Sequence, residues 1–178
     1  QNVLMISNLA TDKWHETPIP DSPRAFHHCA TTGDVDNDGD IDIFVCGAAF
    51  QGANKEPYIL MNDGAGNMSV NRAGLPDSIM DGDVGLVASE LTDLDGDGYL
   101  DLILGRNSSS TTDTSVFWGN GQNFTDLRSI NLTSTEPFVV TYDIKVEDIN
   151  SDGHKDVILL KVTDQLQGYY FQFFMRTA

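Results

Sequence analysis

The chain has 178 residues and a mass of 19.5 kDa, which suits one domain with a sizeable core, or part of a larger one. Hydrophobic residues make up 40% of it, which excludes a disordered chain, and no apolar stretch of about 18 residues predicts a membrane span. Asp and Glu number 27 against 10 Lys and Arg, and this net charge of −17 argues against nucleic acids and anionic membranes as partners.

Apolar runs of strand length recur along the chain. They are too short for helices and rich in β-branched residues, so they predict buried strands. In chain order they fall at residues 26–32, 41–46, 58–61 and 68–71, then 85–91, 100–104, 116–118 and 124–127, and finally 139–146 and 157–160. Gly- and Asn-rich segments between the third and fourth runs predict tight turns, and no amphipathic helix is expected.

Two landmarks repeat with one period. The stronger one is acidic: GDVDNDGDIDIFVCG at 33–47, TDLDGDGYLDLILGR at 92–106 and EDINSDGHKDVILLK at 147–161. Its first aspartates, Asp34, Asp93 and Asp148, are 59 and 55 residues apart. The weaker one is NVLMISN at 2–8, YILMNDG at 58–64 and SVFWGNG at 115–121, with spacings of 56 and 57 from Val3 to Ile59 to Val116. Such a period indicates a repeat architecture.

Four strands per repeat joined by short loops are typical of a propeller blade, so we predict an all-β, β-propeller-like fold of four-stranded antiparallel blades. Residues 1–20 would end one blade, 21–78 and 79–137 would form two blades, and 138–178 would form an incomplete one. These parts amount to about three blades, fewer than the roughly four to eight of a closed propeller. Because the first residue is Gln1 rather than Met, we also expect a processed chain or a piece of a longer one.

The acidic segments follow the pattern D-x-[DN]-x-D-G-x-x-D, in which alternate side-chain oxygens of a tight loop can turn toward one point. Positions 1, 3, 5 and 9 are the predicted metal ligands: Asp34, Asp36, Asp38 and Asp42; Asp93, Asp95, Asp97 and Asp101; and Asp148, Asn150, Asp152 and Asp156. Position 7, held by Asp40, Tyr99 and His154, would contribute its backbone carbonyl. A glycine follows position 5 in each loop, where the chain must bend sharply.

Calcium is the predicted ion in all three loops. Their clustered carboxylates repel one another unless a cation is present, and hard oxygen ligands suit Ca²⁺ far better than Zn²⁺. An EF-hand would need flanking helices and a Glu at position 12, where this chain has Val45, Leu104 and Leu159. Metal-free Asp/Gly-rich turns are the other alternative, an interpretation that three copies in register disfavour.

The segments GDVDNDGDIDIFV, TDLDGDGYLDLIL and EDINSDGHKDVIL, with the turn-bearing YILMNDGAGN and VFWGNGQNF, resemble the FG-GAP/VCBS repeat family. Repeats of this family form the blades of integrin-α-type β-propellers, and the resemblance covers essentially the whole chain. It implies that each acidic loop joins the first two strands of a blade and holds Ca²⁺. Asn150 at position 3 departs mildly from the pattern and makes the third site the weakest. Family members are mostly extracellular adhesion receptors, lectins and non-catalytic modules of secreted enzymes.

Cys29 and Cys46 flank the first acidic loop, five residues before Asp34 and four after Asp42. In a hairpin closed by that loop they would lie opposite one another, where a disulfide can form. The equivalent pairs in the other repeats are Ala88 with Gly105 and Asp143 with Leu160. An extracellular location would favour oxidation, and two buried free thiols are the alternative.

Four Asn-x-Ser/Thr sequons begin at Asn67, Asn107, Asn123 and Asn131, against roughly two expected by chance. In a secreted eukaryotic protein they would be glycosylation sites, and turn-rich polar sequence is the alternative.

No nucleophile–His–acid order, Cys/His cluster or phosphate loop is visible, so we expect no catalysis. His27 and His28 are adjacent on a predicted strand and face opposite ways, so one packed and one exposed imidazole is expected. Four aromatic residues could stack on sugars, although we favour core positions for them. They are Trp14, Trp118, Tyr169 and Tyr170.

The sequence therefore predicts a calcium-binding, extracellular module, secreted or on a cell surface, with a structural or adhesive role. The alternative is a carbohydrate-binding module, either a lectin or the accessory part of a secreted polysaccharide-degrading enzyme. Unpaired strands at residues 2–7 and 169–175 predict completion by further blades of a longer chain, or by neighbouring copies in a homo-oligomer or fibre.

Overall fold

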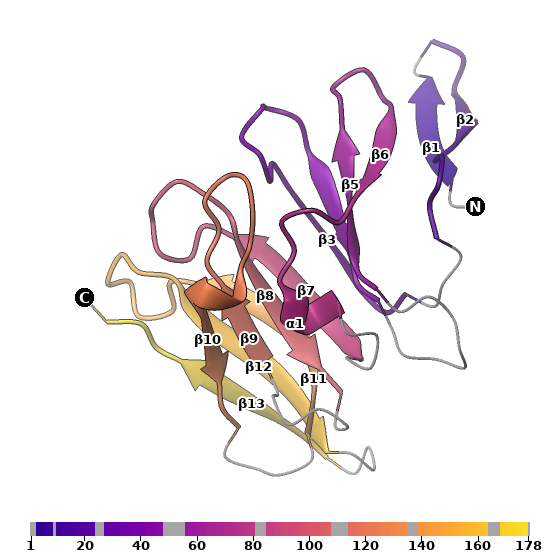
Figure 1. Cartoon of the computed structure of the whole chain (residues 1–178). Helices are drawn as coiled ribbons and strands as arrows, with labels where there is room; N and C mark the ends of the chain where they lie inside the picture. Colours follow the sequence, from indigo (N-terminus) through magenta and orange to yellow (C-terminus); the bar gives the residue numbers. More distant parts are fainter. Residues whose placement is uncertain are drawn as a thin grey trace.

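The computed structural model describes residues 3–8, 10–23, 27–47, 56–80, 85–107, 114–134, 139–163 and 168–177. These residues form 13 strands in four antiparallel sheets, shown in Figure 1. The predicted all-β, propeller-like fold is confirmed. The described helical segments are the single turn α1 (Asp77–Met80) and the 3₁₀ turn η1 (Asp126–Arg128), and neither is long enough to cross a membrane.

Each sheet takes its strands from one continuous stretch of chain. The first sheet consists of β1 (Val3–Asn8) and β2 (Lys13–Pro18). The second consists of β3 (Ala30–Gly33), β4 (Asp42–Val45), β5 (Tyr58–Asn62) and β6 (Met68–Asn71). The third consists of β7 (Leu86–Thr92), β8 (Asp101–Arg106), β9 (Thr114–Phe117) and β10 (Ser129–Leu132). The fourth consists of β11 (Val139–Glu147), β12 (Asp156–Thr163) and β13 (Tyr169–Phe174).

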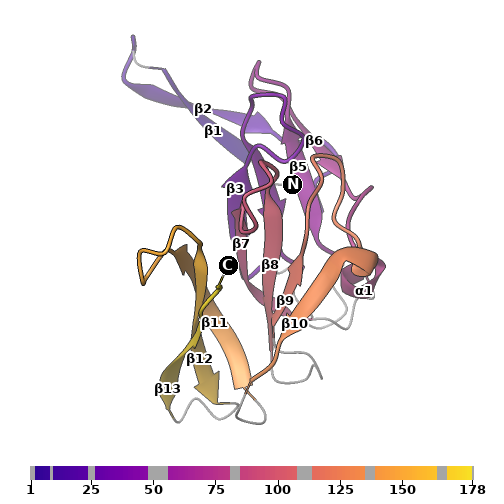
Figure 2. The same cartoon turned by 90° about the vertical axis from the view of Figure 1, so that its left-hand side faces the viewer.

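The sheets stand side by side like blades, and the first strands of the second, third and fourth sheets lie next to one another. Strand β7 contacts β3 on one side and β11 on the other. Within each of these three sheets the later strands run outward from this inner strand, as Figures 1 and 2 show. This arrangement is that of adjacent propeller blades.

The core lies between the sheets. Alternate residues of β4 serve different interfaces, because Phe44 and Cys46 pack toward the third sheet and Ile43 and Val45 toward the first. A central blade is therefore covered on both faces, which explains its continuous apolar strands. In β8, Leu102, Ile103 and Leu104 are all fully buried.

The register of the first two strands agrees with the residue pairs predicted for the third and fourth sheets. Ala88 pairs with Gly105 across β7 and β8, and Asp143 pairs with Leu160 across β11 and β12. The weaker landmark needs a correction at its first copy. Leu4, rather than Val3, packs against the second sheet, so Leu4 corresponds to Ile59 and their spacing is 55.

The fourth strand of the third sheet was predicted at residues 124–127, and this prediction is wrong. That strand is β10, which begins at Ser129. Phe124 is only 2% exposed, because it packs into the core between the second and third sheets and its N–H donates to the Gly74 carbonyl. The 3₁₀ turn then leads the chain back to the sheet and leaves Leu127 97% exposed.

Candidate metal centre

The three acidic loops connect the first two strands of their sheets and share one backbone conformation. Position 4 has a positive φ in each: 58° at Asn37, 82° at Gly96 and 60° at Ser151. The glycine at position 6 also has a positive φ: 97° at Gly39, 90° at Gly98 and 88° at Gly153. A Cβ at these three glycines would meet no atom within 4 Å, so glycine is needed for its conformation rather than for space.

The first aspartate of each loop accepts hydrogen bonds from the backbone inside the loop. Asp34 accepts from the N–H groups of Asp38 and Gly39, both at 3.0 Å. Asp93 accepts from Gly96 and Gly98 at 2.7 and 3.0 Å, and Asp148 accepts from Asp152 and Gly153 at 3.0 and 2.9 Å. These bonds curl the loop around its own first residue and leave lone pairs on the carboxylate free.

The position-9 aspartates connect each loop to the end of the third strand of its sheet or to the residues just after it. Asp42 is 1% exposed and accepts from Val35 N–H at 3.0 Å and Asn62 N–H at 2.9 Å. Asp101 accepts from Leu94 and Gly119 at 2.8 and 2.9 Å, and Asp156 accepts from Ile149 and Arg176 at 3.0 and 2.8 Å. Sequence reasoning assigned these residues only to metal binding and missed this structural role.

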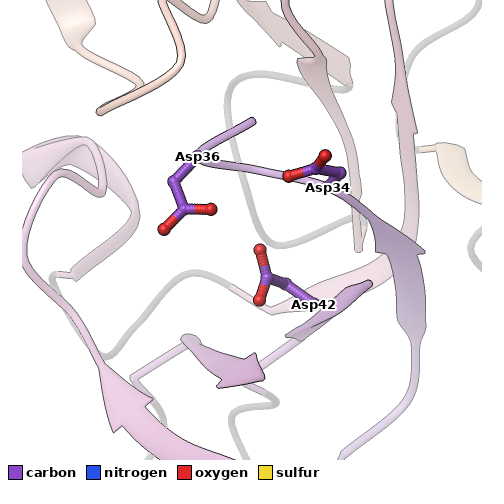
Figure 3. Close-up of side chains that lie close together, drawn as sticks. All are labelled: Asp34, Asp36 and Asp42. Carbon is purple, nitrogen blue, oxygen red and sulfur yellow. The ribbon is translucent and has the colours of Figure 1, made fainter. Parts of the chain in front are cut away.

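Positions 1, 3 and 9 converge in the first two loops. Figure 3 shows the carboxylates of Asp34, Asp36 and Asp42 turned toward a common point, with one oxygen of each within 4.8 Å of the others. Asp93, Asp95 and Asp101 form the same cluster. Because Ca–O bonds are 2.3–2.6 Å, two ligands of one Ca²⁺ lie at most about 5 Å apart, so both clusters fit this ion and could hold it.

Burial, and to a lesser extent neighbouring negative charges, opposes the ionisation of carboxyl groups in and beside these clusters. Burial raises the pKa of Asp42 and of Asp101, although backbone N–H donors act in the opposite direction. Desolvation, followed by the charges of Asp38 and Asp34, raises the pKa of Asp40. A divalent cation at the cluster would relieve this repulsion.

The third loop lacks such a cluster of three acidic groups in the described part of the chain. Its equivalent trio includes the amide of Asn150, whose Nδ2 donates to Asp152 Oδ2 at 2.9 Å. Hydrogen bonds from the His154 N–H and from Asn150 lower the pKa of Asp152. The replacement of aspartate by Asn150 at position 3 therefore changes the hydrogen bonding within the third loop.

Positions 5 and 7 lie beside the clusters. Asp38, Asp97 and Asp152 each accept, at 2.9 Å, the N–H of the position-7 residue two places on. They cap the turn, and none of them belongs to a converging trio. Of the position-7 residues, the Tyr99 ring lies beside Gly121, while Asp40 lies beside Gly64.

Neighbouring loops are linked by contacts that the sequence did not suggest. Asn37 Nδ2 donates to the Gly98 carbonyl at 3.4 Å, and Lys155 Nζ donates to Thr92 Oγ1 at 2.9 Å. The Arg176 guanidinium donates to the carbonyls of Leu94 and Asp95. These partners are 61 to 82 residues apart, so no local pattern could have revealed them.

Cys29 and Cys46 are joined by a disulfide with a Cα–Cα distance of 5.2 Å, and Cys46 N–H donates to the Cys29 carbonyl. The disulfide sits on the β3–β4 hairpin at the end opposite the acidic loop. His27 is half-buried and hydrogen-bonded to the Cys46 carbonyl and Tyr58 Oη, whereas His28 is exposed. Both residues precede β3, which begins at Ala30, so the predicted strand placement of the two histidines is wrong.

The four sequons differ in exposure. Asn67 and Asn131 are exposed, although Asn67 Nδ2 donates to Asp63 and Asn131 Oδ1 accepts from Ser115. Asn123 and Asn107 are half-buried, and the rest of the Asn107 sequon lies outside the described residues.

The aromatic residues also divide into two groups. Trp118 packs against the core cluster between the third and fourth sheets, and Tyr170 is half-buried. Trp14 and Tyr169 are 65% and 67% exposed, so the favoured core assignment is wrong for both. Each lies on an outer sheet, and no further sheet formed by the described residues covers it.

Comparison with protein families gives a match over part of the chain. Residues 93–159 match the FG-GAP-like repeat, from the second acidic loop to the middle of β12. The chain therefore carries a repeat of the predicted type, which indicates a β-propeller-type module. Among curated proteins, no sequence matches this chain.

Proposed function

We propose that this chain, with its FG-GAP-like repeat, is a calcium-binding β-propeller module with a structural or adhesive role outside the cell. The module has no chemistry of its own. Its ions hold the acidic loops closed, and its surface is available for a partner. The observation that carries the proposal is the convergence of positions 1, 3 and 9 in two loops that share one backbone conformation.

Calcium is favoured by the chemistry of the ligands. Each cluster offers carboxylate oxygens and neither histidine nor thiolate, a set that suits a hard cation. The residue type at position 7 also differs among the three loops, as is expected where only the backbone carbonyl is a ligand. The first two sites are the strong ones, and the third, with Asn150, binds more weakly.

The extracellular assignment is supported by the disulfide. Disulfides persist in oxidising compartments, and millimolar calcium is found there too. An N-glycan at Asn67, an exposed sequon, is part of the same proposal.

Further sheets of the same kind are the proposed partners of the open outer faces. In β4 and β8, Phe44 and Ile103 face the next sheet and are fully buried. On the fourth sheet the equivalent face carries Phe171 and Phe173, which are 62% and 54% exposed. A blade from a longer parent chain, or from a neighbouring copy, would bury them.

Thermal melting with and without calcium tests the proposal. An ion that binds only the folded state stabilises it by roughly 2.7 kcal/mol per site at 100-fold excess over Kd. We expect the melting temperature to fall by several degrees in EGTA and to recover with Ca²⁺ better than with Mg²⁺. The double variant Asp36→Asn, Asp95→Asn should lose most of this response, whereas Asp77→Asn, at an exposed position in α1, should keep it. A melting curve that is unchanged by EGTA would overturn the proposal.

A further inference from the structure

A second polar site lies between the second and third sheets, beneath α1 and η1. Figure 2 shows α1 beside the orange helical turn of residues 126–128, where Ser78 N–H donates to the Asp126 carboxylate at 3.0 Å. A cavity of about 170 Å³ opens here and is lined by Ser78, Arg106, Ser115, Asp126, Ser129 and Asn131 over the ring of Phe117. Arg106 ends the strand that Asp101 begins, so this cavity is roughly 16 Å from the second aspartate cluster.

Arg106 is the unusual member of this site. Its side chain is 7% exposed, and its buried Nε has no hydrogen-bond partner among the described residues. Burial lowers the pKa of the guanidinium, although the charge of Asp126 acts in the opposite direction. A buried donor without a partner is destabilising, so a ligand that accepts a hydrogen bond from this Nε would recover the loss.

The hydrogen-bonding groups around Arg106 define what such a ligand must offer. The hydroxyls of Ser78, Ser115 and Ser129 already donate, to Asp126, to Asn131 Oδ1 and to the Asp126 carbonyl. Their oxygens, together with the Asp126 carboxylate, remain as acceptors. The donors that remain are Arg106 and the amide Nδ2 of Asn131. The cavity therefore presents both hydrogen-bond acceptors and donors.

We propose that this cavity binds a small neutral polyhydroxyl compound, such as a single pyranose ring. Its hydroxyls would donate to Asp126 and the serine oxygens, and its oxygens would accept from Arg106 and Asn131. An anion offers only acceptors and would meet the Asp126 carboxylate in a chain of net charge −17. The cavity is smaller than the roughly 300–1,000 Å³ of drug-sized pockets, which suits one ring rather than a longer ligand.

The proposal is independent of the calcium sites and is tested by calorimetric titration in calcium-containing buffer. The probes are the methyl glycosides of glucose, mannose, galactose and fucose, together with N-acetylglucosamine, and sodium sulfate is the anion. Protein made in a bacterial periplasm keeps the disulfide and leaves Asn131 without a glycan. We expect one neutral sugar to bind at one site per chain, without competition from sulfate.

Asn131→Asp is the decisive variant, since it removes the Nδ2 donor at an exposed position and should weaken sugar binding at least tenfold. Arg106→Gln should weaken sugar binding to a similar extent. If that variant does not fold, Arg106→Lys replaces it, because lysine keeps a positive charge at the buried position but lacks the guanidinium donors. Asn71→Asp is the matched control on the outer strand of the neighbouring sheet and should bind like wild type. Two results would overturn the proposal: no binding of any of these sugars, or binding of sulfate that Arg106→Lys abolishes.

Discussion

Asp42 accepts two backbone hydrogen bonds and also faces Asp34 and Asp36, whereas Asp36 is exposed at the turn. The two carboxylates thus differ in their structural roles. Asp42 connects the loop to β5 in the absence of any ion, whereas the role proposed for Asp36 requires a bound ion. In the second loop Asp101 likewise accepts two backbone hydrogen bonds, but Asp95 is half-buried and accepts the Asp97 N–H at 3.1 Å, so the division is less complete there.

This division predicts different results for Asp42→Asn and Asp36→Asn. An amide has one accepting oxygen, so Asp42→Asn leaves Val35 N–H or Asn62 N–H without its acceptor and costs about 1–3 kcal/mol. Urea unfolding in EGTA should show this loss for Asp42→Asn and almost none for Asp36→Asn. Equal losses in EGTA would mean that the two aspartates do not divide their roles in this way.

Glu90 on β7 gives a pH-dependent prediction away from the loops. Burial raises its pKa above the ordinary 4.5, and the charge of Asp143 adds to this effect while Lys145 opposes it. A raised folded-state pKa means that the stabilising contribution of neutral Glu90 is present below pH 4.5 and is lost as pH rises through the folded value. Glu90→Gln stays neutral and should therefore unfold at higher urea than wild type at pH 7, with the difference shrinking toward pH 4. Glu147→Gln, at an exposed position, is the control, and a difference that grows toward acid would contradict the assignment.

At the scale of the elements, most strands could be predicted from local sequence, because buried blades need short apolar runs and each acidic loop marks a hairpin. The pairing of Ala88 with Gly105 follows from counting outward from the loop. The errors in strand placement arose where packing between sheets, rather than local sequence, determines the conformation. Phe124 has a strand-forming side chain, yet the core between two sheets takes it out of the strand. The predicted correspondence of Val3 with Ile59 was wrong by one residue, because a single copy of a weak motif does not reveal which face of the strand is covered.

The aspartate clusters were predictable for a related reason. Alternate acidic residues in a nine-residue loop meet their partners locally, so Asp34, Asp36 and Asp42 could be grouped from spacing alone. Arg106 and Arg176 could not be recognised in this way. Their environment is made by residues from other sheets or from distant turns, and charge content in the sequence does not show burial.

The disulfide of the β3–β4 hairpin is expected to stabilise the fold. The cysteines are 17 residues apart, and closing a loop of about 15 residues stabilises a protein by roughly 3 kcal/mol through the unfolded chain. The double variant Cys29→Ala, Cys46→Ala should lose about this amount in urea unfolding, and dithiothreitol should destabilise wild type but not the variant. Thiol titration of the denatured, unreduced protein checks the bond itself, and two free thiols would refute it.

At the scale of the whole molecule, the exposed outer faces predict self-association of the isolated chain. Tyr169, Phe171, Phe173 and Met175 alternate along β13 and its extension and are all 46–67% exposed. Contiguous exposed apolar side chains on a sheet favour pairing with another sheet. Light scattering at micromolar concentration should give a mass above the 19.5 kDa of one chain.

The matched variants for this experiment use serine. Phe171→Ser with Phe173→Ser should return the mass to that of a monomer, whereas Leu127→Ser, at an isolated residue that is 97% exposed, should not. A wild-type chain that stays a monodisperse monomer would show that these faces do not need a covering sheet.

Calcium binding is the central claim, and direct titration of the EGTA-stripped chain with Ca²⁺ tests it most closely. Dissociation constants of extracellular calcium modules reach about 10⁻⁴–10⁻³ M, so equilibrium dialysis into the millimolar range is the suitable measurement. We predict at least two ions per chain, with one lost in Asp36→Asn and another in Asp95→Asn, and no loss in Asp77→Asn. Retention of all ions in the first two variants, or no binding at millimolar calcium, would contradict the assignment of these loops as metal centres.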